Sequence, residues 1–462
     1  MKIFHICSEC APFAKAGGMA DALLGLLRET KKLGHDVQLI LPKYRFLKLD
    51  ELRKLDTLNM RYDHKECVNQ LWSASYEEIP LLLIEPKTSE AFFERDHIYG
   101  EPDDVERFSY FAKAAASYLE RLSCSPDVIH LHDWHASLVP ALYKKALSIL
   151  TIHNLGYPGV ISKESLEKLE IPDWEIFRCR DYYSLLQGGI ISADQITTVS
   201  PAYSKEILQP ESGGDFCHLL HHYQEKLVGI LNGIDYTYWN PQSDPLIPYH
   251  YNSTQLEGKK ETKKFLQKRL QLEEKECILV GAVTRLVEQK GPRLIKSAVE
   301  KTVEAGGQFL LLGSAQDSNI RALFSELQTT LAPSRSLHIE LQYNEELAHH
   351  IFAASDLFIV PSIFEPCGLT QMIAMRYGTV PLVRATGGLG DTVFEEKNGF
   401  LFGPPEEAAL HHALTRAFAC WRNAPEKWDA LKMNGMREDF SWREPARKYL
   451  ALYDHKLYSR KK

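Results

Sequence analysis

The sequence lacks the signatures of several large protein classes. No apolar run approaches the ~18 residues that a membrane-spanning helix needs, so we expect no membrane partner. The first predicted strand, KIFHIC, is followed by neither GxGxxG nor GxxxxGKS/T, which disfavours a dinucleotide-dependent dehydrogenase and a P-loop enzyme. Short-period repeats and low-complexity segments are also missing, which excludes repeat architectures.

An excess of basic residues is missing as well. The formal net charge is −7, whereas a nucleic-acid binder usually carries a basic excess, so we expect no nucleic-acid partner. The nine cysteines are scattered and odd in number, which suits a reducing compartment better than a disulfide framework. Cys7 and Cys10 form a single CxxC spacing, for which a structural role is favoured over zinc or redox chemistry. The first residues, MKIFHICSEC, show no signal-peptide pattern, so we expect a cytoplasmic protein without a removable leader.

The length and the alternation of elements predict the fold class. The 462 residues are too many for one compact core and fit two domains. Short apolar strands alternate with amphipathic helices, which is typical of parallel sheets covered on both faces. A segment rich in Pro, Tyr and Asn, residues 236–257, indicates the boundary, and we place the domains at residues 1–240 and 241–442. We therefore predict an α/β protein with two doubly wound, Rossmann-like domains that face a cleft.

Individual elements follow from the same alternation. A helix is expected at MADALLGLLRETKKLG and another from about His135 to Lys145, whereas residues 50–110 suggest irregular loops. Strands are predicted at KIFHIC, HDVQLILP, DVIHLHD, SILTIHN, QITTVS and KLVGILNGI in the first domain, and at ECILVGAVTR, QFLLLGS, SLHIEL, DLFIVPS, TVPLVRA and GFLF in the second. Ligands of such sheets bind beyond the carboxyl ends of the strands, so the loops there are the candidate site.

The first of these loops contains KAGGMADA, residues 15–22. Gly17 and Gly18 would let the backbone approach a ligand, and the following helix would offer free N–H groups and the positive end of its dipole. Lys15 adds a full positive charge, and Asp21 would cap the helix or hold the shape of the loop. The pattern is typical of a phosphate site, and a tight turn with a surface lysine is the alternative.

Histidines gather after two later strands. HLHDWH ends one of them, and His130 and His132 would point to the same side of that strand. A metal site is the alternative to a polar cluster at the cleft, and the cluster is favoured because no second group of histidines and carboxylates follows. In such a cluster Asp133 is free to accept sugar hydroxyls, and His130 is a satisfied strand-end histidine. In TIHN, His153 and Asn154 can both donate and accept, and a packed, hydrogen-bonded histidine is the alternative.

The second domain places two cations at the end of a strand. LVGAVT ends in Arg285, and Lys290 follows in the next turn. This spacing suits a diphosphate, because an arginine can grip two oxygens while a lysine acts as a point charge. Surface charge on a loop is the alternative. Together with the polar residues of the first domain, these cations fit an activated sugar, which has a diphosphate leaving group and a polyhydroxylated ring.

A later turn, FEPCGLT, adds groups of a different kind. Glu365 lies just before a helix, where it could hydrogen-bond ligand hydroxyls, and Gly368, Leu369 and Thr370 offer backbone N–H groups to an anion. No base is paired with Cys367, which favours a packed or sugar-contacting residue over a nucleophile.

Taken in order, these motifs resemble those of bacterial glycogen synthases and plant starch synthases. KAGGMAD is similar to the family's K-T/V-G-G-L-A/G-D, and the match continues through HDWH, TIHN, NGIDYTYWNP, TRLVEQKG, FEPCGLTQ and RYGTVPLVRATGGLGDTV. The resemblance covers nearly the whole chain, and several motifs of this length in order are very specific. It implies two facing Rossmann-like domains of the GT-B glycosyltransferase type, with a C-terminal helix at about residues 443–462 that completes the first domain.

The resemblance also implies an activity. Glucose would pass from ADP-glucose, held on the second domain, to the non-reducing end of an α-1,4-glucan such as glycogen, held on the first, with retention at the anomeric carbon. Retention would come from a covalent carboxylate intermediate or from same-face attack, in which the departing phosphate takes the acceptor proton; the family is assigned the second route. Fixed cations aimed at the leaving diphosphate would be the main electrostatic contribution, so no metal or other cofactor is expected.

Individual roles are implied residue by residue. The diphosphate would be bound by Lys15, Arg285, Lys290 and Thr370, and the phosphates and acceptor end by the Gly17-Gly18 loop, with Asp21 contacting the nucleotide. The sugar or the cleft would be lined by Asp133, His153, Asn154, Asn232, Glu365, Cys367, Gly368 and Leu369. Catalytic roles are expected for Lys15, Asp133, His153, Arg285, Lys290 and Glu365.

One departure keeps the donor open. Many retaining relatives carry a second glutamate eight residues after the first, often on a ribose, and here that position is Ile373. Recognition of the nucleotide must then lie elsewhere, so a related transferase that uses UDP-glucose or another acceptor is the alternative. A catalytically silent glucan-binding protein is a further alternative, against which the intact Lys15, Arg285, Lys290 and Glu365 argue. The oligomeric state cannot be read from this sequence.

Overall fold

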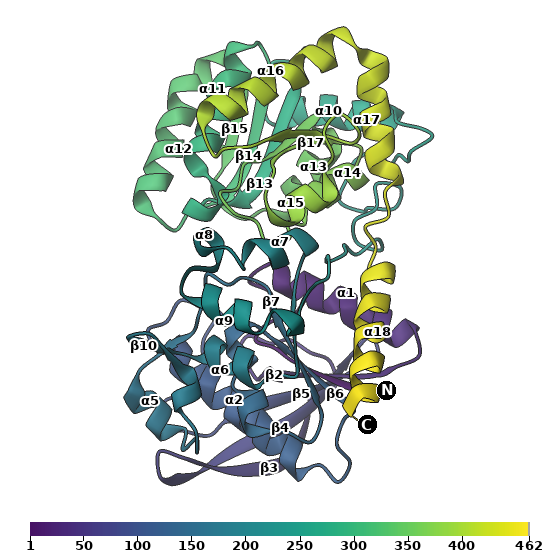
Figure 1. Ribbon diagram of the computed structural model, residues 1–462. Helices are drawn as coiled ribbons and strands as arrows, with labels where there is room; N and C mark the ends of the chain where they lie inside the picture. The colour runs from purple at the N-terminus through teal and green to yellow at the C-terminus, as the bar shows by residue number, and fades with distance from the viewer. Residues whose placement is uncertain (461–462) are drawn as a thin grey trace. The chain divides into compact units, whose positions relative to one another are not determined.

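The computed structural model describes residues 1–460, which form two compact units. Unit 1 comprises Met1–Gly233 and the segment that begins at Trp442, and unit 2 comprises Ile234–Ser441 (Figure 1). The last two residues of the predicted C-terminal helix, 461 and 462, lie outside the described residues. Among the helices of the described chain, none is long and apolar enough to cross a membrane.

Unit 1 is built on a nine-stranded sheet with the order β12-β11-β7-β6-β1-β2-β5-β4-β3. The strands from β12 to β5 run parallel, and β4 and β3 continue the sheet antiparallel. The strands are β1 (Lys2–Ile6), β2 (Asp36–Pro42), β3 (Arg53–Tyr62), β4 (Lys65–Tyr76), β5 (Ile79–Pro86), β6 (Val128–His132), β7 (Leu147–Ile152), β11 (Gln195–Thr198) and β12 (Leu227–Gly229). A small separate sheet consists of β8 (Val160–Ile161), β10 (Tyr182–Ser184) and β9 (Arg178–Cys179).

Helices cover both faces of the parallel part of this sheet, which is why its central strands β1, β6 and β7 are buried along almost their whole length. They are α1 (Gly18–Lys32), α2 (Asp104–Arg121), α3 (Asp133–Ala136), α4 (Val139–Leu142), α5 (Lys163–Lys168), α6 (Leu185–Ser192), α7 (Pro201–Glu206), α8 (Pro210–Gly213), α9 (Cys217–His222) and α18 (Arg443–Arg460), with 3₁₀ turns η1 (Glu175–Phe177), η2 (Gly214–Phe216) and η3 (Gln224–Lys226). Helix α18 comes from the end of the chain and packs beside α1 (Figure 1). A Cβ atom at Gly25 of α1 would lie 2.0 Å from Trp442 Nε1, so this contact requires glycine.

The predicted helix from His135 to Lys145 is wrong in its extent. The chain forms two short helices instead, and α3 ends at Ala136. Pro140 explains the break, because a proline has no N–H to donate to the carbonyl four residues earlier and its ring clashes with that carbonyl.

The expectation of irregular loops over residues 50–110 is wrong for the part up to residue 86, where β3, β4 and β5 lie, whereas residues 87–103 contain no helix or strand. Both hairpins turn through two residues with positive φ, Asp63 and His64 in the first and Glu77 and Glu78 in the second. This is the backbone of the type I′ turn that matches the twist of paired strands. Such turns are usually announced by Asn-Gly or Asp-Gly, and neither pair occurs at these positions, so the hairpins left no clear signal.

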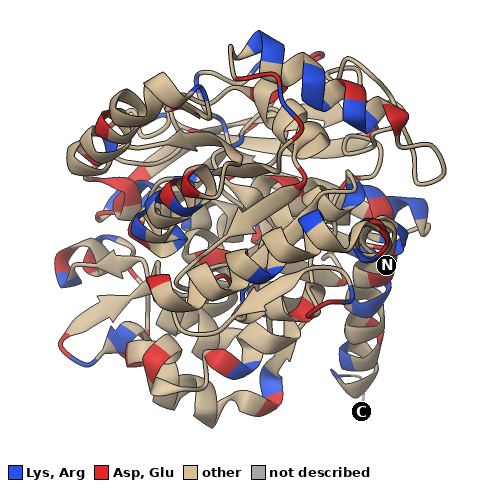
Figure 2. Cartoon of the chain, turned by 90° about the horizontal axis from the view of Figure 1, so that it is seen from above, with Lys and Arg blue, Asp and Glu red and all other residues tan. Residues whose placement is uncertain are grey.

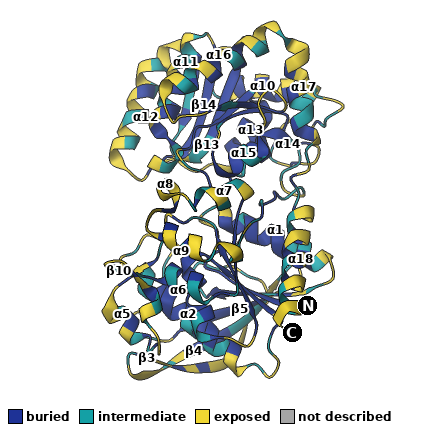
Figure 3. Ribbon diagram, viewed as in Figure 1, coloured by how far each residue is buried: buried dark blue, intermediate teal, exposed yellow. Residues whose placement is uncertain are grey.

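Unit 2 has a six-stranded parallel sheet with the order β15-β14-β13-β16-β17-β18. Its strands are β13 (Leu279–Arg285), β14 (Gln308–Ser314), β15 (Leu337–Glu340), β16 (Leu357–Val360), β17 (Val380–Arg384) and β18 (Phe400–Phe402). Its helices are α10 (Glu257–Arg269), α11 (Pro292–Glu304), α12 (Ser318–Leu331), α13 (Glu345–Ala354), α14 (Thr370–Arg376), α15 (Gly387–Thr392), α16 (Glu407–Asn423) and α17 (Pro425–Arg437), with 3₁₀ turns η4 (Glu288–Lys290) and η5 (Ala332–Ser334). In unit 2 and in the parallel part of the unit 1 sheet the strands are mostly buried, whereas β3 is mostly exposed (Figure 3).

The connector that was expected around residues 236–257 packs on unit 2. Asp244 is fully buried within it and accepts hydrogen bonds from His349 Nδ1 at 2.7 Å and from the Tyr377 hydroxyl at 2.6 Å. Trp239 stacks on the same histidine with ring centroids 4.2 Å apart. The connector is therefore part of the unit 2 core, and unit 2 begins at Ile234.

Both sheets contain a topological switch point. In unit 1, β1 lies between β2 and β6, and in unit 2, β13 lies between β14 and β16. From β1 and β13 the chain continues to the neighbour on one side, and from β6 and β16 to the neighbour on the other side. The loops after these adjacent strands therefore separate and form a crevice at the carboxyl ends of the strands. The loops after β1 and β6, and those after β13 and β16, are thereby the candidate ligand sites of the two units. Acidic and basic residues are interspersed over both units rather than separated by sign (Figure 2).

Candidate active site

The loop after β1 carries the first predicted cation. Lys15 Nζ lies 2.8 Å from Asp21 Oδ1, and the two side chains are 35% and 36% exposed. Asp21 is in the first turn of α1, but the N-cap residue is Gly17 and no side chain caps the helix. Of the two structural roles expected for Asp21, the structure shows the one in which it holds the loop, and its contact with the nucleotide stays a prediction.

A buried carboxylate that the sequence analysis missed shapes this loop. Glu9 Oε2 accepts the backbone N–H groups of Ala16 and Gly17 at 2.7 and 2.8 Å. Glu9 is only 3% exposed, and burial raises its pKa while the two N–H donors oppose the rise. The backbone N–H of Gly17 is therefore not available to a phosphate, and the free N–H groups predicted for the helix concern α1, which begins at Gly18. The signal was a single acidic residue directly after a buried strand.

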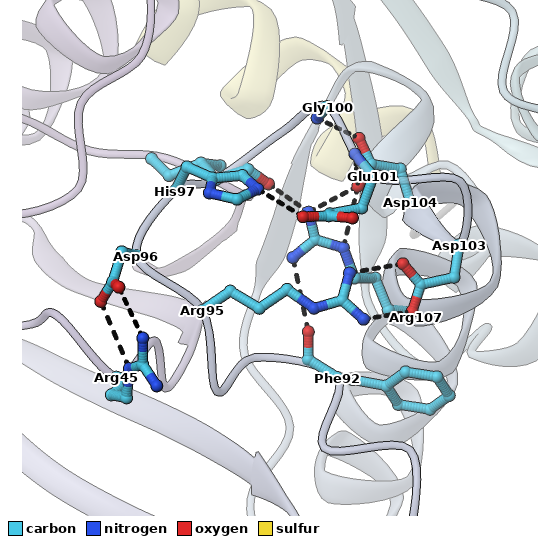
Figure 4. A network of polar contacts seen from close by, with 11 residues as sticks. Arg45, Phe92, Arg95, Asp96, His97, Gly100, Glu101, Asp103, Asp104 and Arg107 are labelled. Atoms are coloured by element: carbon cyan, nitrogen blue, oxygen red, sulfur yellow. Dashed lines mark hydrogen bonds and ion pairs between the residues drawn. The ribbon is translucent and has the colours of Figure 1, made fainter.

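A second missed residue, Tyr99, reaches the same loop from the segment between β5 and α2. Its hydroxyl lies 2.7 Å from Ser8 Oγ. The segment is anchored by Arg107, which is fully buried and donates to the Ile98 carbonyl at 2.5 Å. Arg107 also donates to Asp104 Oδ1 at 2.6 Å (Figure 4). Further ion pairs in the same network join Arg95 to Asp103 and Arg45 to Asp96 (Figure 4).

Asp133 is the first residue of α3 and directly follows β6. It has a φ of +54° and is buried, and its Oδ1 accepts the backbone N–H groups of His153 at 2.6 Å and Asn154 at 3.3 Å. Burial raises the pKa of this carboxyl to about 7, and the two backbone donors oppose that rise. Asp133 is therefore not free to accept sugar hydroxyls at that oxygen, since it holds the TIHN loop in place.

The histidines of the two loops form a buried cluster with His5 of β1. His130 Nδ1 is 2.7 Å from the Tyr453 hydroxyl and its Nε2 is 2.6 Å from Thr151 Oγ1, so the prediction of a satisfied histidine is confirmed. His132 and His153 are hydrogen-bonded to each other at 3.0 Å, as in the packed alternative considered for TIHN.

A metal could be considered at this cluster, because the nearest ligand atoms of three histidines lie within 4.8 Å of one another. These residues are His5, His130 and His132. However, all four ring nitrogens of His130 and His132 already take protein partners. The donor set also contains no carboxylate or thiolate to balance a buried divalent charge, so it fits a hydrogen-bonded network better than a metal.

Two predicted asparagines complete the unit 1 side. Asn154 Oδ1 accepts the backbone N–H of Gly156 at 3.0 Å, which fixes an Asx turn. Asn232 follows β12, is buried, and donates its backbone N–H to the Val199 carbonyl at 3.4 Å. Both residues sit after the carboxyl ends of parallel strands of the same sheet.

In unit 2 the predicted cations occupy the switch point. Arg285 is the last residue of β13 and is exposed, and within residues 1–460 its guanidinium makes no ion pair. Lys290 Nζ lies 2.5 Å from Glu365 Oε2, and the two side chains are 19% and 7% exposed. Ser362 Oγ donates to the same carboxylate oxygen at 2.8 Å. The structure thus brings Lys290 and Glu365 together, from the loops after β13 and β16.

The turn that follows Glu365 packs on the second Gly-Gly pair. A Cβ atom at Gly387, which has a φ of +44°, would lie 1.9 Å from the Glu365 carbonyl, and one at Gly388 would lie 2.3 Å from the Cys367 carbonyl. Cys367 is buried, in agreement with a packed residue. RATGG is therefore a platform for the turn, a role that the sequence analysis did not assign.

The residues after Cys367 leave backbone donors available. Gly368 has a φ of +72°, Leu369 is the N-cap of α14 and Thr370 is its first residue. Within residues 1–460 their N–H groups take no protein acceptor. The predicted N–H donors therefore lie in one turn, next to the Lys290–Glu365 pair.

Family comparisons identify both parts of the chain. Residues 2–222 match the starch synthase catalytic domain, and residues 262–434 match the glycosyl transferases group 1 family. A glycogen synthase of Protochlamydia amoebophila is 41% identical, with 98% of this chain and 99% of the relative aligned. Glycogen synthase 1 of Nitrosococcus oceani is 40% identical with the same coverage.

Solved structures agree with these relatives. The catalytic domain of starch synthase IV from Arabidopsis thaliana, bound to ADP and acarbose, superimposes with a TM-score of 0.94 at 40% identity over 99% of both chains. A sucrose-phosphate synthase from Thermosynechococcus elongatus shares the fold, with a TM-score of 0.64 at 19% identity. The predicted α/β fold and the resemblance drawn from the motifs are both confirmed. The chain belongs to the glycogen and starch synthase family of glycosyltransferases.

Proposed function

We propose that the protein transfers glucose from ADP-glucose to the non-reducing end of an α-1,4-glucan such as glycogen, with retention at the anomeric carbon and release of ADP. The observation that carries the proposal is the pair of cations, Arg285 and Lys290, at the switch point of the unit 2 sheet. It occurs in a chain that aligns over nearly its whole length with a glycogen synthase. The ADP and acarbose in the starch synthase IV structure support the donor and the glucan acceptor. The nine cysteines, all free, support a reducing, cytoplasmic location.

Arg285 and Lys290 would stabilise the leaving group. Breaking the bond between the glucose and the diphosphate develops negative charge on the phosphate oxygen, and preorganised cations lower the free energy of that state. Arg285 suits this role because no carboxylate of the described chain occupies its guanidinium. Lys290 can contact a phosphate and Glu365 at the same time, because an ammonium has three N–H donors.

Glu365 would bind donor hydroxyls rather than attack the sugar. Its Oε2 already accepts from Lys290 and Ser362, which lowers the charge available for nucleophilic attack and leaves Oε1 to accept from a hydroxyl. The N–H groups of Gly368, Leu369 and Thr370 would bind the phosphate beside it. This arrangement favours same-face attack, in which the departing phosphate takes the proton of the acceptor.

Unit 1 would supply the acceptor side and one further cation. Lys15 would turn from Asp21 to the diphosphate, since an ion pair this exposed exchanges with a ligand at little free energy. Gly17 and Gly18 would leave room for the ligand, because a Cβ atom at Gly17 would meet only Glu9 Oε1, at 3.6 Å. His153, Asn154 and Asn232 would contact the sugars.

The test is glucose transfer to glycogen from ADP-glucose and from UDP-glucose in parallel, each with and without EDTA. We expect transfer from ADP-glucose, undiminished by the chelator, and an α-configured product linkage by NMR. Transfer from UDP-glucose alone would overturn the donor, and a loss of activity with EDTA would overturn the metal-independent mechanism. The absence of transfer from either donor would contradict the proposed function and favour a glucan-binding protein.

A further inference from the structure

Three imidazoles of unit 1 form a hydrogen-bonded line that ends at the candidate site. His5 Nδ1 lies 3.2 Å from His132 Nε2, and His132 Nδ1 lies 3.0 Å from His153 Nε2. The three residues come from β1, from β6 and from the loop after β7. These three strands are neighbours in the sheet, so the line of imidazoles runs across them beside the switch point. His5 and His132 are buried, whereas His153 is partly exposed. We call these three residues the imidazole ladder.

The rings of the ladder are neutral, because burial lowers the pKa of His5 and His153 to about 3 and that of His132 well below its ordinary value. A neutral imidazole has one N–H donor and one acceptor nitrogen. Since His132 is bonded through both nitrogens, its own tautomer fixes those of its two neighbours. Only two arrangements of the ladder satisfy both hydrogen bonds.

The two arrangements differ at the ends of the ladder. In one, His5 donates to His132, His132 donates to His153, and His153 carries its proton on Nδ1. In the other, every bond is reversed, and His153 carries its proton on Nε2. The inner end decides between them, because His5 Nε2 is buried without a hydrogen-bond partner. It is a bare acceptor in the first arrangement and an orphaned N–H in the second.

Buried N–H donors without a partner are rarer in folded proteins than buried acceptors without one. The first arrangement is therefore favoured, and hydrogen bonds that point the same way along a chain polarise and strengthen one another. The outer end is then defined as well. His153 presents an N–H at Nδ1, and this atom takes no protein partner within residues 1–460.

We propose that His5 and His132 are positioning residues that hold His153 in its Nδ1–H tautomer, so that this N–H donates to a hydroxyl oxygen of the bound sugar. The proposal rests on the function proposed above and adds a chemical restriction to it. Because the basic nitrogen of His153 is occupied by the His132 N–H, His153 binds as a neutral donor and does not take the proton of the acceptor.

The neighbouring His130 provides a matched control. It lies on the same strand as His132, is equally buried, and stacks on it with ring centroids 4.4 Å apart. Its nitrogens are bonded to Tyr453 and Thr151, however, and not to His153. Its replacement therefore disturbs the same core without breaking the ladder.

The first experiment is long-range ¹H–¹⁵N NMR of the full chain with ¹⁵N-labelled histidine, in the absence of substrate. The protonated and bare nitrogens of a neutral imidazole resonate in separate ranges, so the spectrum gives the tautomer directly. The His153 signals are assigned by their loss in His153→Asn. We expect a protonated Nδ1 and a bare Nε2. A protonated Nε2 on His153 would overturn the proposal, and so would signals of His5 and His132 that move when a chelator is added.

The variants then test the connection to the reaction. His132→Phe should shift the His153 signals toward the tautomer average of an unpartnered ring and lower kcat about 10-fold, less than the loss of a whole stabilising donor. His132→Asn, which keeps an N–H near the position of Nδ1, should restore both properties in part. His130→Gln should lower the melting temperature but leave the His153 signals and kcat unchanged.

Unchanged His153 signals in His132→Phe would contradict the ladder. Addition of ADP and a malto-oligosaccharide should move the Nδ1 signal of the wild-type protein, and an unmoved signal would contradict the contact with sugar. Because the tautomer is measured without substrate, this result stands apart from the transfer assay. A protein that transfers no glucose can still confirm or refute the ladder.

Discussion

Units 1 and 2 share a plan but use their carboxylates differently. In unit 1, Glu9 and Asp133 each accept two backbone N–H groups and so fix the loops after β1 and β7. In unit 2, Glu365 accepts from two side chains, Lys290 and Ser362. A side-chain partner can move to a ligand, whereas a backbone partner is part of the loop. The same chemical group therefore serves as a structural clamp in one unit and as an exchangeable contact in the other.

This contrast also separates the two sets of cations. Lys15 of unit 1 has a paired, exposed side chain at the surface of a rigid loop. Lys290 of unit 2 is mostly buried and its partner even more so, which strengthens its electrostatic interaction with a charge that develops nearby. Unit 2 should accordingly contribute more to stabilising the leaving group, and two lysine variants test this difference.

The largest effect is expected in unit 2, for Lys290→Ala. Removing this ammonium should lower kcat by about 10³-fold, the upper range for one preorganised stabilising contact. Steady-state transfer from ADP-glucose to glycogen measures the change. Lys296→Ala is the matched control, because Lys296 pairs with Glu300 at the same 2.5 Å on the outer side of α11. A similar loss of kcat in both variants would contradict a role of Lys290 in the reaction. So would a melting temperature of Lys290→Ala that is low enough to explain the loss of kcat by unfolding.

A smaller effect is expected in unit 1, for Lys15→Ala. We predict a loss of kcat of at least ~10²-fold with the fold intact, because in the proposed mechanism Lys15 would add one charge contact to the leaving group. Lys31→Ala serves as the control, since Lys31 also pairs with a carboxylate, that of Glu78. Its side chain is 32% exposed, which is similar to the 35% of Lys15. An unchanged rate in Lys15→Ala would leave the whole diphosphate to unit 2.

The smallest effect on turnover is expected for Asp133→Asn, where the change should appear in stability instead. Burial raises the pKa of Asp133 from 3.8 to about 7. Between these values the folded protein holds a proton that the unfolded chain has lost, so the contribution of this carboxyl to the free energy of unfolding falls as pH rises and is gone above about 7.

Urea unfolding near pH 5 and near pH 8 measures that contribution. Between these two pH values the free energy of unfolding of the wild-type protein should fall by about 2 kcal/mol more than that of Asp133→Asn. The asparagine keeps an acceptor for the N–H groups of His153 and Asn154 but cannot ionise. Parallel pH dependence in the two proteins would mean that Asp133 is charged in the folded state, and the clamp would then be ionic.

Local patterns were sufficient for much of the fold. The strands of unit 2 are short apolar runs that end at polar turns, so alternation alone located β13 to β18 and placed Arg285 and Lys290 at the end of a strand. The hairpins of unit 1 were missed because their turns adopt positive φ at Asp63-His64 and Glu77-Glu78, without glycine or asparagine to signal it. Nothing in the local sequence of these pairs encodes the strands that meet across them.

The candidate site divides in the same way. The charged residues that were predicted at a strand end, Arg285 and Lys290, do lie there, because their position in the chain decides their place in the fold. Glu9, Tyr99 and the Gly387-Gly388 platform were missed, because each acts on a segment far away in the sequence or through close packing that only the folded backbone reveals. Asp133 was identified, but its hydrogen bonds to the backbone N–H groups of His153 and Asn154 were missed for the same reason.

The last helix of the chain belongs to the first unit, and this has a consequence for synthesis. During translation the ribosome completes all of unit 2 before it makes α18. Until then the surface of α1 around Gly25, which packs against Trp442, is uncovered, and His130 lacks the Tyr453 hydroxyl. Unit 1 therefore cannot complete its folding until Ile234–Ser441 and the helix that follows have been synthesised. A premature stop shortly before Trp442 would leave unit 2 whole and damage the unit that was made first.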